Sequence, residues 1–498
     1  MLNEVQMFYF KLREKIPFLF DSSVFRFVYI ALLFLDSVFY AKIVTDFLYF
    51  AIFGWGVAIT FFNYIFNGKV IKIKYIGWIS AFLISTVVTM FININSNFWP
   101  NFVMLLHISV CFIVFYGMHV ESDKQKIKKE IYYIAKFIVI ASSVIAAIGF
   151  VLLIIFEKQI IVQGSKCIIY ENRFTGIYTN PNLLAFSAVV AIFMCHILIQ
   201  KSFLQDIGKK MPHKALLITC VVLNVLSLFL SDSNDSTVFL AIYIVLFMIY
   251  KLFFEQKKAS EENNQDANKS SFQILKKCGI VFLATVVISV GCFTARFISQ
   301  NGMMEVMDFA KAIHITIPGA QNNKEITFEH QNTNIDSGRI VLLSQSTILI
   351  SEDPIFGIGK GNLVEYGNRY IKGGLHFDDL HNGFLTILVC SGLVGFTIFI
   401  IFCLYIGRRM LLCLFRSRKF ISNYSIFPCF IMFIISYCFY GLFEKTVLLD
   451  ITFMVMIFWL IIGYAFVYTK EIENSRRYHM LKRYRIIEKE QKEKAKQL

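Results

Sequence analysis

Three side chains with the chemistry of phosphate binding and proton transfer stand close to the ends of apolar stretches: Arg173, Arg339 and His381. A guanidinium group pairs with two phosphate oxygens at once and stays charged when it is partly removed from water. An imidazole accepts a proton from a sugar hydroxyl near neutral pH. Together these residue types suit a site that holds a pyrophosphate group and moves a proton.

Each of these residues also has a plainer interpretation, which the sequence leaves open. An arginine at a membrane surface can simply reach a lipid phosphate, and His381 can act as a hydrogen-bonding group at a helix end. The glycines of Gly357-Ile-Gly-Lys-Gly361 predict a tight turn. They do not predict a nucleotide site, because no parallel-sheet unit surrounds them.

Acidic residues offer further candidates. The segment His376-Phe-Asp-Asp-Leu-His381, together with Asp232 and Asp235, has the ligand types of a divalent-cation site. Its spacing matches no strong metal signature, so we expect no metal. Asp36 falls within or at the end of the first apolar stretch, where an ionisable residue is a functional candidate. Glu444 and Lys445 are expected to form a local pair, with Glu444 as a reserve candidate base.

The whole composition is that of a membrane protein. Of 498 residues, 57% are hydrophobic and 17% charged, with 54 Phe, whereas soluble domains carry about a quarter charged residues. Because a helix needs about 20 apolar residues to cross the hydrocarbon, the sequence predicts an all-α polytopic membrane protein with about twelve transmembrane helices. The predicted spans are approximately Phe25–Ala41, Phe47–Phe66, Tyr75–Ile94, Phe98–Val120, Ile131–Phe156, Pro181–Gln200, Ala215–Leu230, Thr237–Phe254, Gly279–Ile298, Gly383–Ile406, Ile426–Leu442 and Thr446–Val467.

The net charge of +15 comes mainly from lysines and arginines in short connectors and at the two ends of the chain. This distribution argues against nucleic acid as a partner and is typical of cytoplasmic loops. Every second connector is basic, which predicts that both termini are cytoplasmic. The mixed stretch Met1–Lys15 does not have the pattern of a cleavable signal.

This pattern divides the chain into four parts. Residues 1–298 are expected to hold nine transmembrane helices, and residues 383–468 the last three. Residues 299–382 form a large external loop, in which Met303–His314 and Ile340–Ile350 are predicted as short helices. Residues 469–498 form a basic cytoplasmic tail, whose charged helix either lies near anionic headgroups or is simply solvated.

The residues named first also carry a family resemblance. The segments Arg173-Phe-Thr-Gly with Asn180-Pro-Asn182, Arg339 through Pro354-Ile-Phe-Gly-Ile-Gly, and His381-Asn-Gly with a later Ser391-Gly-Leu-Val-Gly395 resemble motifs of the O-antigen ligase and polymerase superfamily. These motifs lie between Arg173 and Gly395, and the helix plan resembles the family over nearly the whole chain.

The resemblance implies an inverting glycosyl transfer on the external face of the bacterial cytoplasmic membrane, without metal or cofactor. Arg173 and Arg339 would neutralise an undecaprenyl-pyrophosphate leaving group, and His381 would be the general base. Further substrate-binding candidates are Asn182, Lys360, Arg369, Asp36 and Glu444. The partners would be undecaprenyl-pyrophosphate-linked oligosaccharide, membrane lipid and other polysaccharide-assembly proteins, such as a flippase or a chain-length regulator.

One departure from the family pattern bears on the reaction. Family members often carry Ser-Arg in an external link that here reads Ser231-Asp-Ser-Asn-Asp-Ser236. This difference favours a capsule-type polymerase, which joins repeat units, over a ligase, which transfers a finished chain. Three other classes stay open: a flippase for lipid-linked sugars, a metal-dependent glycosyltransferase that uses Asp232 and Asp235, and a non-catalytic scaffold.

Overall fold

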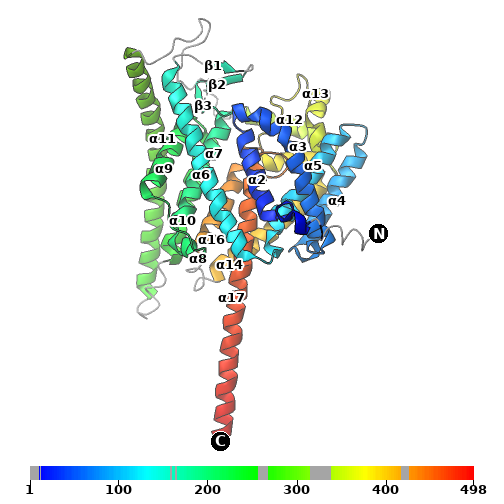
Figure 1. Cartoon of the computed structure of the whole chain (residues 1–498), viewed down its shortest axis with the longest axis vertical. Helices are drawn as coiled ribbons and strands as arrows, with labels where there is room; N and C mark the ends of the chain where they lie inside the picture. The colour runs from blue at the N-terminus through cyan, green and yellow to red at the C-terminus, as the bar shows by residue number, and fades with distance from the viewer. Residues whose placement is uncertain are drawn as a thin grey trace.

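Long apolar helices dominate the protein, seen here in a computed structural model that describes residues 11, 13–156, 160–162, 165–255, 267–313, 338–416 and 425–497 (Figure 1). The α-helices are α2 (Ser22–Asp36), α3 (Lys42–Ile59), α4 (Ile76–Ile92), α5 (Phe98–Val110), α6 (Lys124–Ile155), α7 (Pro181–Leu198), α8 (Lys201–Asp206), α9 (Lys214–Leu230), α10 (Asn234–Tyr250), α11 (Ala267–Ala312), α12 (Arg339–Glu352), α13 (Leu363–Tyr370), α14 (Gly383–Arg416), α16 (Ile426–Tyr440) and α17 (Phe453–Gln497). Shorter helical turns extend several of them.

The predicted fold class is confirmed: the chain is an all-α polytopic membrane protein. Among the described residues, eight helices are long and apolar enough to cross a membrane, and three shorter apolar helices accompany them. The predicted first span corresponds to α2, which has only 15 residues and carries Arg26 in its second turn. The number of twelve spans therefore stays a prediction.

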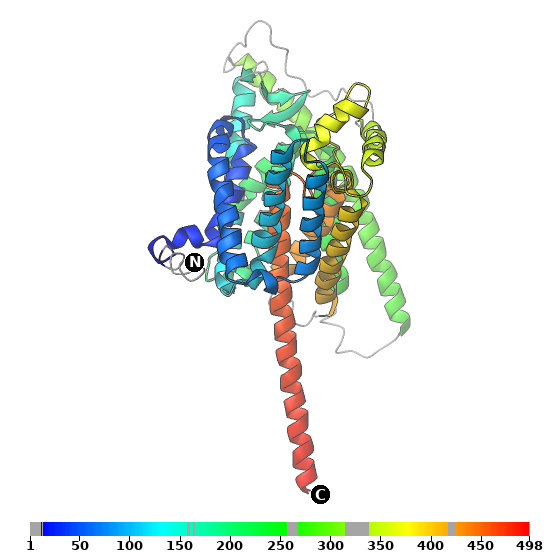
Figure 2. The same cartoon turned by 90° about the vertical axis from the view of Figure 1, so that its right-hand side faces the viewer.

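The bundle has two distinct ends (Figures 1 and 2). We call the end that carries the strands and the starts of α7 and α14 the sheet end. The C-terminal half of α17 projects away from the opposite end, which we call the tail end. The helices α12 and α13 also lie at the sheet end (Figure 1), so this described part of the predicted loop shares one side of the molecule with the strands.

A small antiparallel sheet forms in the segment between α6 and α7, where the sequence predicted no strand. Its strands are β1 (Ile160–Val162), β2 (Ser165–Tyr170) and β3 (Arg173–Gly176), in the order β1-β2-β3. Branched and aromatic residues favour this pairing. The backbone after β3 bonds to the end of α2, since Thr179 N donates to Ser37 O at 3.0 Å. The sheet thus joins α2 to the start of α7.

Of the two predicted short helices, one is confirmed as a separate element, and the other is helical over residues 303–312 but is not separate. The segment predicted as Met303–His314 is not a separate element, because α11 continues without a break to Ala312. Nothing in the sequence between Ile298 and that point stops a helix, as no proline interrupts it. The predicted helix Ile340–Ile350 is α12.

The glycine-rich turn before α13 docks into a break in α14. The break is at Gly392, whose backbone has φ 63° and ψ −175°. Opposite it, Ile358 N donates to Val389 O at 3.1 Å and Gly359 N donates to Cys390 O at 2.9 Å, while Leu393 N donates to Pro354 O. Non-helical backbone is tolerated inside a membrane protein when its polar groups are satisfied in this way.

Polar side chains in α4, directly after it and in α5 also form hydrogen bonds with this turn. Thr89 Oγ1 donates to Phe356 O at 2.5 Å, and Asn93 Nδ2 donates to Gly357 O at 3.2 Å. Asn101 Oδ1 accepts from Gly361 N at 2.8 Å. The chain that follows α12 is therefore anchored from three helices, and this anchoring places the loop that leads to His381.

Replacing Gly357 with alanine is expected to destabilise the protein much more than replacing Gly373. Both glycines have positive φ, 75° and 89°, so both substitutions cost about 1 kcal/mol in backbone strain. A Cβ at Gly357 would also collide with the backbone of Cys390 and Gly392, whereas one at Gly373 meets nothing within 4 Å. Overpacking of this kind costs about 1–3 kcal/mol more. Thermal unfolding of the two purified variants measures the difference in stability. An equal loss of stability in both variants would contradict the close packing of this turn against α14.

Candidate active site

A chain of hydrogen bonds at the sheet end links four of the predicted site residues. Arg173 Nη2 donates to Asn182 Oδ1 at 2.5 Å, and Asn182 Nδ2 donates to Glu444 Oε1 at 2.8 Å. The other carboxylate oxygen, Glu444 Oε2, lies 3.4 Å from His381 Nδ1. We call Arg173, Asn182, Glu444 and His381 the polar chain. Arg173 and His381, which lie far apart in the sequence, are thus linked through Asn182 and the buried carboxylate of Glu444.

Local sequence features hold each member of the polar chain. Arg173 is the first residue of β3 and also donates from Nε to Ser231 O at 2.8 Å. Asn182 stands in the first turn of α7, which Asn180 caps by accepting from Asn182 N and which Pro181 begins. Capping by asparagine and proline in the first turn are favourable at a helix start. Strand and helix therefore present these side chains to each other.

His381 is held in an unusual backbone conformation. Its φ is 43°, a region that non-glycine residues rarely adopt and that clusters at functional sites. Asp379 Oδ1 accepts from His381 N at 2.8 Å. Two residues later, Gly383 N donates to Gly441 O and Glu444 O at 2.8 and 3.0 Å. These bonds tie the start of α14 to the link between α16 and α17, and so bring Glu444 beside the imidazole.

The contact with Glu444 makes His381 more basic. The hydrogen bond that His381 donates to the Glu444 carboxylate raises the pKa of His381 above its ordinary value, while burial works in the opposite direction. Because a carboxylate accepts, Nδ1 carries the hydrogen in this pair, which leaves Nε2 to take up a proton. The geometry is that of a general base oriented by an acid.

Arg339 lies next to the polar chain. It is the first residue of α12, forms an ion pair with Asp235, and its guanidinium lies 5.3 Å from the ring centre of Phe443. Phe443 directly precedes Glu444 in the link between α16 and α17. An arginine stacked on an aromatic ring keeps its charge and its remaining N–H groups for an anion.

The surroundings of Arg173 are rich in carboxylates. Burial lowers the pKa of Arg173, and the negative charges of Asp232 and Glu171 oppose this effect. Arginine remains charged in any such setting. The link Ser231–Ser236, which has no arginine of its own, also receives Arg296 from α11, 2.7 Å from Asp232. Sequence reasoning missed Arg296 because it falls near the end of an apolar span.

The acids considered as metal ligands bind cationic side chains instead. Asp232 pairs with Arg296 and Asp235 with Arg339, and Asp379 lies 2.6 Å from Lys445 Nζ. Within the described ranges no group of three or more His, Cys, Asp or Glu side chains is placed to hold a metal ion. The acids here serve to hold basic side chains in position.

The expected local pair of Glu444 and Lys445 is wrong. Lys445 points to the buried acids Asp379 and Asp450, at 2.6 and 3.7 Å, while Glu444 belongs to the polar chain. Burial lowers the pKa of Lys445, but the charges of Asp450 and Asp379 outweigh it and raise that pKa above its usual value. Neighbouring residues in a tight link point to different sides, which a linear sequence does not reveal.

Three other predicted residues occupy different surroundings. Burial raises the pKa of Asp379, but the charges of Lys445 and then Lys360 outweigh it and lower that pKa, so Lys360 acts electrostatically on the carboxyl that precedes His381. Asp36 ends α2 and accepts from Thr45 Oγ1 at 2.8 Å. Arg369 is exposed and pairs with Glu365 on its own helix α13; no contact among the described residues joins it to the polar chain.

Replacing Glu444 with glutamine is expected to shift the pH dependence of activity to lower pH. The substitution keeps the shape but removes the charge that raises the His381 pKa. Since a general base acts when it is unprotonated, activity should then appear at lower pH, with a reduced maximum because the base is weaker. The pH profile of glycan synthesis in membranes measures this shift. Glu365→Gln, an exposed acid on α13, is the control, and a shift in that variant would contradict the assignment.

Residues 219–400 match the family model described as O-Antigen ligase. A search of the curated proteins found no match. The matched region contains Arg296, Arg339, Lys360 and His381, while Arg173, Asn182 and Glu444 lie outside it and reach the same place through the fold. Over this region, which holds the Arg339 and His381 motifs, the chain is similar to the O-antigen ligase family, within a polytopic helical architecture.

Proposed function

We propose that this integral membrane protein is a polysaccharide polymerase, which joins oligosaccharide repeat units carried on undecaprenyl pyrophosphate. The match of residues 219–400 to the O-antigen ligase family model supports a ligase- or polymerase-like function in glycan assembly. The single observation that carries the finer proposal is the polar chain, in which the buried Glu444 carboxylate connects His381 through Asn182 to Arg173, while Arg339 lies over the adjacent Phe443. The products would be capsule, exopolysaccharide or O-antigen.

In the proposed reaction, an acceptor sugar hydroxyl attacks the anomeric carbon of the donor glycan from the side opposite the pyrophosphate. A new C–O bond forms as the bond between that carbon and the pyrophosphate oxygen breaks, with inversion. His381 Nε2 takes the proton of the hydroxyl. Arg173 and Arg339 neutralise the charge that develops on the departing undecaprenyl pyrophosphate. No metal or cofactor takes part.

The remaining residues orient the reactants. Glu444 keeps the imidazole of His381 in the tautomer that leaves Nε2 as acceptor. Asn182 links Glu444 to Arg173, so that the base and the phosphate-binding group have a fixed separation. Lys360, which acts electrostatically on Asp379, is proposed to contact the substrate. Asp36 and Arg369 are proposed to bind sugar at the edge of the site, away from the polar chain.

The proposal includes an orientation in the bacterial cytoplasmic membrane. The sheet end would face outward, and both termini would lie in the cytoplasm, in keeping with the basic connectors. This places the reaction on the side where flipped, lipid-linked repeat units are available. A flippase that supplies them and a chain-length regulator are the expected partners.

The test is the size of the lipid-linked glycan in cells that lack the protein, with and without the wild-type gene. Single repeat units stranded on the outer leaflet, restored to long chains by the wild-type protein, are the expected result. Long chains that accumulate on the lipid would instead indicate a ligase. Single units trapped on the inner leaflet would indicate a flippase and would contradict the proposal.

Removal of divalent cations is expected to leave the purified polymerase active. The acids near the site are paired with arginine or lysine, and arginines take over the charge neutralisation that a metal would otherwise supply. Synthesis should therefore continue in the presence of EDTA and should not increase when Mg²⁺ or Mn²⁺ is added back. Loss of activity with EDTA that the cation restores would favour the metal-dependent alternative.

A further inference from the structure

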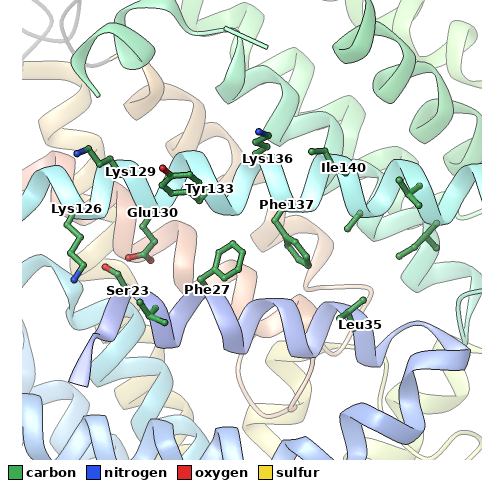
Figure 3. Close-up of a pocket in the computed structure, with 14 residues that line it drawn as sticks. Ser23, Phe27, Leu35, Lys126, Lys129, Glu130, Tyr133, Lys136, Phe137 and Ile140 are labelled. Carbon is green, nitrogen blue, oxygen red and sulfur yellow. The ribbon is translucent and has the colours of Figure 1, made fainter. Parts of the chain in front are cut away.

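A groove of about 880 Å³ runs between α2 and α6 and opens to the outside of the bundle. It lies apart from the polar chain, and none of the predicted site residues lines it (Figure 3). At one end are residues from the starts of both helices, including Ser23 and Lys126, toward the tail end. At the other end Leu35 and Ile145 approach the sheet end.

The groove is a fixed feature, because its two walls are joined at its floor. Arg26, fully buried in α2, bonds to both oxygens of Glu130 on α6 at 2.8 and 2.7 Å. Phe27 follows Arg26 on α2, and its ring meets that of Phe137, about two turns beyond Glu130 on α6, edge to face with centres 5.6 Å apart. A buried ion pair and an aromatic contact hold the helices at a set separation. The space between them cannot close by side-chain movement alone.

The two halves of the groove differ in chemistry. From Phe137 to Ile145 its α6 wall is apolar, and Phe27 and Leu35 face it from α2. Toward the tail end the same wall carries Lys126, Lys129, Tyr133 and Lys136. Eight residues of helix rise by about 12 Å, which is close to the hydrocarbon depth of one leaflet, about 15 Å. The dimensions fit one lipid molecule with its headgroup among the lysines.

The charge at the headgroup end is positive and incompletely neutralised. The negative charge of Glu130 is paired with Arg26, and the carboxylate also accepts a hydrogen bond from the hydroxyl of Tyr464 at 2.8 Å. Lys126 pairs with Asp21 at 2.5 Å. Lys129 and Lys136 are exposed, and among the residues that the structure describes neither has an ion-pair partner. Two such ammonium groups on flexible stems attract an anionic headgroup in preference to a zwitterionic one.

We propose that the α2–α6 groove binds one anionic phospholipid of the leaflet at the tail end. The phosphate lies against Lys129 and Lys136, and the acyl chains cover Phe27, Phe137 and the apolar wall up to Ile145. The ligand fastens α2 to α6 and stabilises the fold. This site is separate from the proposed pyrophosphate site, which is at the opposite end of the bundle, and it does not depend on the proposed reaction.

The experiment measures retention of phosphatidylglycerol by the purified full-length protein in a neutral detergent, with phosphatidylcholine as the competing lipid, by native mass spectrometry. The wild-type protein is expected to keep one phosphatidylglycerol and to unfold at a higher temperature with it. The double variant Lys129→Glu, Lys136→Glu should bind it about tenfold or more weakly, since two ammonium groups that attract the phosphate become carboxylates that repel it.

Two further variants separate charge from shape. Ala141→Phe leaves the charge unchanged and fills the apolar half, so it should also weaken retention. Lys72→Glu with Lys201→Glu reverses two exposed lysines outside the groove and should retain the lipid as the wild type does. Unchanged binding in both groove variants, or an equal loss in the control, would overturn the proposal. So would undecaprenyl phosphate displacing phosphatidylglycerol, because the groove would then hold the substrate's tail.

Discussion

Replacing His381 with alanine is expected to stop chain growth, with a fall in rate of about a hundredfold to ten-thousandfold. The imidazole is the general base of the proposed reaction, and its Nδ1 lies 3.4 Å from the Glu444 carboxylate. Without it the acceptor hydroxyl must attack while it still carries its proton. The measurement is the length of lipid-linked glycan made by membranes that contain equal amounts of wild-type and variant protein.

His376→Ala is the matched control for this variant. That histidine lies five residues earlier, is exposed, and packs its ring against Phe377. Its loss should leave chain length unchanged, and both variants should unfold at temperatures close to that of the wild type. Long chains made by His381→Ala at the normal rate would exclude His381 as the base. They would favour a scaffold, or a different base such as Glu444.

Replacing Arg339 with methionine is expected to lower the rate by about a hundredfold to a thousandfold. The guanidinium stands over Phe443, beside the link that carries Glu444, and its charge is proposed to balance the pyrophosphate as it leaves. The effect should appear mainly in kcat, because the charge on the leaving group is largest in the transition state. Synthesis from lipid-linked repeat units at saturating concentration measures it.

Arg339→Lys and Arg369→Met are the informative comparisons. Lysine keeps the charge but lacks the planar fork that binds two phosphate oxygens, so it should restore part of the rate. Arg369 pairs with Glu365 on the surface of α13, and its loss should have a much smaller effect. If Arg339→Met raised KM and left kcat unchanged, the residue would bind substrate without stabilising the departing pyrophosphate.

Under these proposals, the two ends of the molecule have separate functions. The polar chain at the sheet end depends on contacts among α7, α14 and the link between α16 and α17. The groove depends on α2 and α6, joined by Arg26 and Glu130. Variants in the groove should therefore change lipid retention and stability while the pH profile of synthesis stays that of the wild type.

The amino-acid sequence alone predicts the class of the protein and most of the candidate site residues. Apolar stretches long enough for a bilayer are a local property, because each helix satisfies its own backbone hydrogen bonds in lipid. The motifs at Arg173, Arg339 and His381 were likewise visible as short patterns. The strands β1 to β3 lie between α6 and α7, in a segment that the sequence predicts only as a link between spans.

Which charged groups contact one another becomes visible only in the folded chain. Glu444 was predicted to pair with its neighbour Lys445, but the fold turns it toward His381 and Asn182. Arg296 reaches Asp232 from another helix, and the turn at Gly357 fits a break in α14 that no local pattern marks. Hydropathy and helix periodicity depend on residues close in sequence, whereas these contacts join segments that are far apart and depend on how the helices pack.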